Sequence, residues 1–320
     1  MSIKVKTAPL TTNDTLSQFR ALTRKFALFH TLFFSFFIVQ LLILLIFLPF
    51  LAKSFLLAVV VASTVLTAFA YFVLRFYYQT KKPEQFLFLR DAFVQNIEHL
   101  HQPLLPSIDQ LLQQLEGQEY QYYSLPASLQ SLAPLVQKFS VWCHFDDVLL
   151  MKELLHSTAI QTLISKIKNH PTDLELHTAL AKAFIAFYKI YQDPSNPGAP
   201  LYSFIAKEYS SEQMTQKFHK YAQCALEELK ILIHYLPHDR WALAQLGTVY
   251  HDLDQKEDER KTYELLLQIS PQEQGIRYRL GVLYFQLGFM AQGLKVYDDL
   301  RRMNDPKAAE LIQYYDQYFL

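Results

Sequence analysis

Two long apolar runs near the N-terminus limit the fold of this chain more than any other feature. They are separated by the short segment 49–53 and cover residues 26–48 (FALFHTLFFSFFIVQLLILLIFL) and 54–74 (SFLLAVVVASTVLTAFAYFVL). Each run reaches the roughly 20 residues that an α-helix needs to cross the hydrocarbon core of a bilayer. Neither run shows the polar face that a surface helix of a soluble protein carries. The sequence therefore predicts a transmembrane helical hairpin over residues 26–74, which contacts the lipid bilayer.

Basic residues flank this hairpin on its open side. The first run is preceded by Lys4, Lys6, Arg20, Arg24 and Lys25, and the second run is followed by Arg75, Lys81, Lys82 and Arg90. The turn between the runs carries a single basic residue, Lys53. The positive-inside bias then places both termini in the cytoplasm, with residues 1–25 as a cytoplasmic tail. We expect the bacterial inner membrane as the location. Within the runs, His30 and Gln40 are expected to form hydrogen bonds between the helices, or to snorkel toward the interface, rather than to form a proton path.

Composition narrows the classes of function. The 30 basic and 30 acidic residues cancel, so the chain lacks the positive field that a dedicated nucleic-acid-binding protein needs. Only 7 glycines occur in 320 residues, which disfavours glycine-loop nucleotide sites and suits helices. The two cysteines, Cys143 and Cys224, are too few for a disulfide framework and are expected to be small buried side chains. An all-α fold without nucleic acid as a partner follows.

A spacing of 34 residues recurs in the C-terminal third. The pairs separated by this interval are Leu246 and Leu280, Gly247 and Gly281, Tyr250 and Tyr284, Tyr263 and Tyr297, Leu266 and Leu300, and Pro237 and Pro271. A glycine lets two helices approach closely, a tyrosine fills the space beside it, and a proline ends a helix. The pattern predicts repeated pairs of helices, with Asp254 and Gly288 at the turns in a left-handed backbone conformation.

Over residues 240–306 this pattern resembles the tetratricopeptide repeat family, with its Leu-Gly-x-x-Tyr motif and closing proline. The resemblance implies a right-handed helical solenoid that binds proteins and has no catalytic activity. Glu259 stands where the family has a small residue, a position that Gly293 respects one period later.

The chain thus divides into five expected parts. After the tail (1–25) and the hairpin (26–74) come a helical connector (75–140) with breaks at Pro103, Pro106, Pro126 and Pro134, helical repeats (141–306) with an insertion near 193–212, and a capping helix (307–320). The insertion is indicated by the proline-rich segment 193–200 (DPSNPGAP). The capping helix is expected to pack through Ala309, Ile312, Tyr315 and Phe319.

No motif points to catalysis. The phosphate-binding, dinucleotide, zinc-protease and nucleophile-elbow signatures are absent from the sequence. Pairs of potential ligands lack a third partner, so neither a metal nor another cofactor is expected: His234 and His238, His99 and His101, and Cys143 and His144. Asp146 and Asp147 are expected to cap the start of a helix rather than to act as acid and base. An enzyme hidden in the middle region is the remaining alternative.

A binding groove is the best functional candidate. In the family that the repeats resemble, the first helix of each pair lines a concave surface. The positions that this implies here are Trp241, Ala244, Thr248, His251, Tyr278, Val282 and Phe285. Large aromatic side chains often anchor partners, but these rings could equally pack against a neighbouring unit. An apolar or aromatic-bearing segment is the expected ligand.

The expected function is that of a membrane-anchored adaptor or scaffold that binds a protein partner through its repeats. Two alternatives stay open. The closely spaced apolar runs behind a Ser/Thr-containing N-terminus also resemble chlamydial inclusion-membrane proteins, which would make the chain a secreted effector in a host vacuole membrane. The hairpin could also have a structural role in shaping the membrane.

Overall fold

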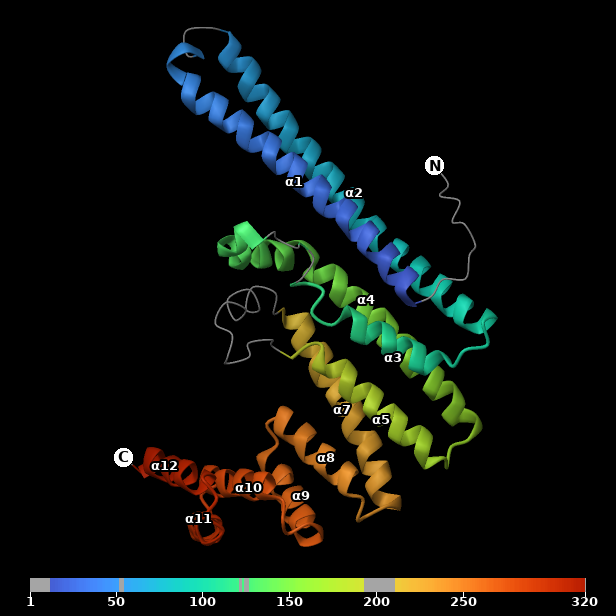
Figure 1. The fold of residues 1–320 in the computed structure, drawn as a ribbon, viewed down its shortest axis with the longest axis vertical. Coiled ribbons are helices and arrows are strands. Elements are labelled where there is room, and N and C mark those ends of the chain that lie inside the picture. Colours follow the sequence, from blue (N-terminus) through green and yellow to red (C-terminus); the bar gives the residue numbers. More distant parts are fainter. Residues whose placement is uncertain (1–11, 52–54, 121–122, 124–126, 193–210, 320) are drawn as a thin grey trace. The chain divides into compact units, whose positions relative to one another are not determined.

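The computed structural model describes residues 12–51, 55–120, 123, 127–192 and 211–319, and every regular element in these ranges is a helix (Figure 1). An all-α fold is therefore confirmed. The chain divides into two units, the first through Ala159 and the second from Ile160 onward. The expected boundary at residue 140 is wrong, because it falls inside the long helix α4 (Ala133–Asn169).

The N-terminal hairpin consists of α1 (Thr12–Leu51) and α2 (Leu56–His99), which pack against each other. By length and composition, both helices are apolar enough to cross a membrane. Their large apolar side chains are widely exposed, as at Leu45 (76%) and Phe69 (66%). An outward-facing apolar surface of this kind is what a lipid-facing helix pair requires.

Polar and aromatic contacts join the two helices of the hairpin. The Nδ1 atom of His30 lies 3.2 Å from the hydroxyl of Tyr71, and Nε2 of Gln40 donates to Oγ of Ser63 at 3.0 Å. The ring of Phe29 contacts the ring of Tyr71 in a stacked arrangement. The expectation that His30 and Gln40 make interhelical hydrogen bonds is thus confirmed.

Both hairpin helices continue beyond the apolar runs into a core with α3 (Leu104–Leu115) and α4. This core buries side chains from all four helices: Leu16, Phe19, Phe86, Leu89, Phe93, Ile97, Ile108, Leu111, Leu115, Val148, Met151, Leu155 and Ala159. Residues 12–25 are therefore not a tail, since they form the first turns of α1 and pack through Leu16 and Phe19. These two residues are three apart, so they share one helix face.

The prolines of the expected connector mark helix starts more often than breaks. Pro103 is the N-cap of α3, and Pro106 and Pro134 lie in the first turns of α3 and α4, where a missing N–H is tolerated. Pro126 lies outside the described residues. Pro83 stands inside α2, which continues through it to His99.

The second unit is a series of helices in which each packs against the next. After the end of α4 these are α5 (Leu174–Lys189), α7 (Glu212–Tyr235), α8 (Arg240–Asp252), α9 (Lys256–Ile269), α10 (Gln274–Gln286), α11 (Met290–Arg302) and α12 (Lys307–Phe319). Helices α10 and α11 begin 34 residues after α8 and α9, so the spacing of the sequence is a spacing of helices. The expected insertion lies largely outside the described residues.

Glycines make room for the close helix contacts. A Cβ at Gly247 would collide with the ring of Tyr263, and a Cβ at Gly281 would lie 2.6 Å from Cδ2 of Leu311. At the turns, Asp254 (φ 55°) and Gly288 (φ 82°) have the expected left-handed conformation. Glycine and aspartate are among the residues that tolerate it.

The capping helix packs through a face that differs by one residue from the expected one. Ala308 and Leu311 are buried in α12, whereas Ala309 is exposed and Ile312 and Tyr315 are partly buried. The side chain of Phe319 lies outside the described residues. The absence of a side chain at Gly281 explains the difference, because the side chain of Leu311 occupies the space that a Cβ at this position would need.

Candidate partner-binding surface

The seven candidate groove residues come from the first helices of the two helix pairs. Trp241, Ala244, Thr248 and His251 lie on α8, and Tyr278, Val282 and Phe285 lie on α10. Within each helix their spacing of three or four residues places them on one face. The face of α8 keeps access to solvent, since His251 is exposed and the other three are partly buried.

On α10 the same face is covered. Val282 (3% exposed) and Phe285 (1%) are buried with Leu300 of α11 and Leu311 of α12. The ring of Phe285 lies so close to Gly293 that a Cβ there would collide with it. Val282 and Phe285 therefore belong to the core in this structure and are not accessible to a partner. Tyr278 is the candidate on α10 that keeps partial exposure.

A lysine ammonium lies over each of the two accessible aromatic rings. The ammonium of Lys182, from α5, lies 5.0 Å from the centre of the Trp241 ring, and that of Lys307, from α12, lies 5.7 Å from the Tyr278 ring. Cations at these distances are attracted by the ring face. The accessible part of the surface therefore combines aromatic and basic groups.

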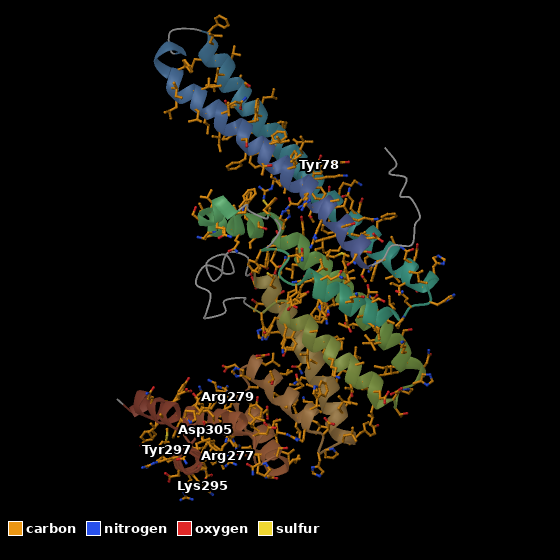
Figure 2. The ribbon with its side chains drawn as sticks, viewed as in Figure 1. Tyr78, Arg277, Arg279, Lys295, Tyr297 and Asp305 are labelled. Atoms are coloured by element: carbon orange, nitrogen blue, oxygen red, sulfur yellow. The ribbon has the colours of Figure 1, made fainter. Side chains whose placement is uncertain are left out.

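A charged network joins α8, α9 and α10. Glu259 of α9 is completely buried, and its carboxylate accepts two hydrogen bonds from Arg279 of α10, from Nε at 2.7 Å and from Nη2 at 3.0 Å. Nη2 of Arg279 also lies 2.6 Å from Nδ1 of His251. Arg279 is labelled in Figure 2 among the side chains of the last helices. Burial lowers the pKa of Arg279, but the Glu259 carboxylate outweighs it and raises that pKa.

This network explains how the chain departs from the pattern at Glu259. A buried carboxylate is costly unless a cation and hydrogen bonds satisfy it. Arg279 supplies both, and the side chain of Arg279 is itself only 28% exposed. Sequence reasoning found Glu259 but not its partner. A charged residue at a small-residue position was a signal to search the next helix for the opposite charge.

One candidate ligand pair, Cys143 and His144, lies in the first unit beside a buried polar cluster that includes Lys82, Asp147 and Tyr123. Lys82 pairs with Asp147 at 2.9 Å, and Nε2 of His144 lies 3.0 Å from the hydroxyl of Tyr123. Asp147 lies in the middle of α4, so the expectation that it caps a helix start is wrong; the helix begins fourteen residues earlier, at Ala133. Its carboxylate is instead buried against a lysine of α2.

Burial controls the protonation of this cluster. It raises the pKa of Cys143 to about 11, so the thiol stays protonated at neutral pH and is a poor nucleophile. Burial, with help from Lys82 and Arg24, lowers the pKa of His144 to about 4. Over the part of the chain that the structure describes, no three histidine, cysteine or acidic side chains are grouped so as to hold a metal ion.

No protein-family model matches this chain, and no curated protein matches it either. The functional argument therefore depends on the residues and their geometry.

Proposed function

We propose that this chain is a membrane-anchored, non-catalytic adaptor that holds a protein partner through the exposed face of α8 and the start of α10. The observation that carries the proposal is the 34-residue recurrence of helix pairs in a chain that also has two helices apolar enough to cross a membrane. Stacked helix pairs of this length form right-handed solenoids in the tetratricopeptide repeat family, which this sequence resembles. Anchoring raises the effective concentration of a bound partner at the membrane without any chemistry.

The bilayer contact assigned to this adaptor is residues 26–74, with both termini in the cytoplasm of a bacterial cell. The basic residues on the open side of the hairpin support this orientation. Cysteine labelling in sealed membrane vesicles tests it, because Lys53→Cys should react from the side opposite to a cysteine placed after Leu320. Labelling of both positions from one side would contradict the hairpin.

The chemistry of the surface also suggests the partner. Trp241 offers a large aromatic anchor, and aromatic side chains dominate the energetics of many interfaces. The lysines over the rings add positive charge that an acidic side chain on the partner can approach. We therefore assign to the partner an apolar or aromatic segment that carries nearby acidic residues.

Photocrosslinking from the full-length chain in its native membrane tests this surface. A photoreactive amino acid at position 241 or 278 should crosslink one recurrent protein, while the same group at Lys261, an exposed position on α9, should not. Lys182→Glu, combined with Lys307→Glu, should reduce the crosslink because it reverses the charge beside both rings. Equal crosslinking from position 261 would contradict a surface on α8 and α10, and crosslinks to host proteins would favour the secreted-effector alternative.

A further inference from the structure

The first three turns of α4 expose an apolar stripe that nothing in the proposed adaptor function uses. Leu135 (64% exposed), Phe139 and Trp142 (54%) recur at intervals of four and three residues and so lie on one face of the helix. Leu132, at the end of the short helix η1 (Ala127–Leu132), is also exposed and precedes them. We name Leu135, Phe139 and Trp142 the α4 stripe.

The buried side of the same turns carries polar groups beside the apolar Val141. Ser140 is completely buried, and its hydroxyl donates to the carbonyl oxygen of Glu119 at 2.8 Å. His144 is completely buried too and contacts the hydroxyl of Tyr123. A surface helix in water normally turns polar groups outward and exposes few large apolar side chains. The three exposed side chains of the α4 stripe depart from this arrangement and favour an apolar environment outside the helix.

The α4 stripe continues directly onto the hairpin. The ring of Trp142 contacts the ring of His30 edge to face, with 6.5 Å between the ring centres. His30 lies just inside the first apolar run, near its N-terminal end. The stripe therefore stands at the level where the apolar surface of the hairpin begins.

Basic side chains also lie near the start of the first apolar run. Lys82 lies over the ring of Phe26, the first residue of the first apolar run, at 4.7 Å from the ring centre. Lys82 and Arg24 are also the charges that act most strongly on His144, two residues beyond Trp142. Tryptophan beside a row of lysine and arginine is typical of the headgroup layer of a membrane. One turn beyond Trp142 the stripe ends at Asp146.

We propose that the α4 stripe lies in the interfacial layer of the same bilayer that the hairpin crosses. Phospholipid is the occupant that these observations favour, because the stripe joins a surface suited to face lipid and is bordered by Arg24, an exposed cation that attracts lipid phosphates. The first turns of α4 then act as an interfacial helix that fixes how deeply the first unit sits. This inference rests on the proposed anchoring of the hairpin in a membrane.

The chain is suited to a direct test, because it has only two tryptophans and neither lies in the apolar runs. In the full-length Trp241→Phe variant, Trp142 is the sole tryptophan; Trp142→Phe leaves Trp241 as the matched control. Each variant is reconstituted into vesicles of phosphatidylcholine and phosphatidylglycerol, three to one, in which the phosphatidylcholine carries bromine at one of two depths. Bromine quenches tryptophan fluorescence only at close range.

We expect Trp142 to lose about half of its emission or more with bromine near the carbonyl end of the acyl chain, and clearly less with bromine near the methyl end. Trp241 should change little with either lipid. Replacing Leu135 and Phe139 by asparagine in the Trp241→Phe background should reduce the quenching of Trp142, while the chain still floats with the vesicles.

Three other outcomes overturn the inference. If the chain floats with the vesicles and Trp142 is quenched no more than Trp241, the hairpin is anchored but the α4 stripe does not touch lipid. A crosslink from position 139 to another protein, without quenching of Trp142, would assign the stripe to a protein partner instead. If the chain does not float at all, both the anchoring and this inference are wrong.

Discussion

The two units of this protein bury polar groups in different ways. In the first unit, the buried pair Lys82 and Asp147 joins α2 to α4 across 65 residues of sequence. In the second unit, the buried pair Glu259 and Arg279 joins neighbouring helices across 20 residues. The buried carboxylate of Glu259 thus finds its cation on the next helix, whereas the buried carboxylate of Asp147 finds its cation on a distant segment. The two tryptophans, one in each unit, allow the units to be followed separately.

The largest expected effect is a loss of stability in the second unit. In Arg279→Met the carboxylate of Glu259 stays buried without its cation, which should lower the free energy of unfolding of this unit by about 3 kcal/mol. Thermal or denaturant unfolding of the solubilised chain, followed by Trp241 fluorescence in the Trp142→Phe background, measures the loss. The unfolding of the first unit, followed by Trp142 in the Trp241→Phe background, should not change.

A double variant provides the control. Glu259→Ala with Arg279→Met removes both charges and restores the small residue that the repeat pattern has at this position, so it should recover most of the lost stability. Equal destabilisation in the single and double variants would show that Arg279 acts through its packing and not through Glu259.

Acid should weaken the first unit more than the second. Burial lowers the pKa of His144 and of His156 to about 4, so the unfolded chain binds protons that the folded unit does not accept as pH falls below the usual histidine value. Between pH 7.5 and pH 5 we expect a net loss of the order of 2 kcal/mol, since the raised pKa of buried Asp147 opposes part of the effect. The unfolding temperature reported by Trp142 measures it.

In the second unit the sign is opposite. Burial lowers the pKa of His177, but its hydrogen bonds to Glu228 and to the carbonyl of Pro171 outweigh burial, so the net pKa is raised. This stabilisation is fully present below the unfolded pKa and is lost as pH rises through the folded value. Replacing His144 and His156 by glutamine should remove the acid sensitivity of the first unit. A sensitivity that persists in that variant would contradict the assignment to these histidines.

The sequence predicted the second unit better than the first for a physical reason. The 34-residue spacing, the turns at Asp254 and Gly288 and the glycine contacts are local features, and each leaves a repeated mark in the sequence. The register of α12 was wrong because it depends on the space above Gly281, which a helical pattern alone does not show. In the first unit, the packing of Phe19 on Phe86 joins segments that share no pattern.

The candidate surface was predictable only in part. The repeat resemblance placed the candidates on one face of α8 and one face of α10, but it did not show which of these side chains stay accessible. Phe285 is buried because α11 has glycine at position 293 and α12 covers the ring beside it. The sequence did not predict the α4 stripe, because Leu135, Phe139 and Trp142 lie in a mixed segment with Gln137, Lys138 and Ser140 and form no long apolar run.

Two glycines test whether close helix contact is what the repeated glycine provides. Gly247→Ala places a methyl group against the ring of Tyr263, so the second unit should lose about 1–2 kcal/mol, although alanine favours a helix over glycine by about 1 kcal/mol. The nearest atom to a Cβ at Gly275 is the flexible Nζ of Lys307, at 3.7 Å, so Gly275→Ala should leave stability unchanged or raise it. If the two substitutions change the stability of the second unit equally, close helix contact is not the reason for the repeated glycine.

The smallest expected effect on stability comes from the N-terminal ends of α8 and α10, which are equivalent positions of the 34-residue repeat. The carboxylate of Asp239 caps α8 by accepting a hydrogen bond from the backbone N–H of Ala242 at 2.6 Å. Glu273, at the corresponding position before α10, makes no such bond and pairs with exposed Arg240 instead. Asp239→Ala should therefore lower the stability of the second unit by about 1 kcal/mol, whereas Glu273→Ala should change it by about 0.5 kcal/mol or less.

Unfolding followed by Trp241 fluorescence measures both cap variants against the same background. Asp239→Asn is the matched control, because asparagine can accept the same hydrogen bond and should retain most of the stability. If Asp239→Ala and Glu273→Ala lower the stability equally, the two helix starts contribute the same stability despite their different contacts. If they differ as expected, the extra methylene of glutamate is enough to exchange a helix cap for a weak surface ion pair within an otherwise regular 34-residue period.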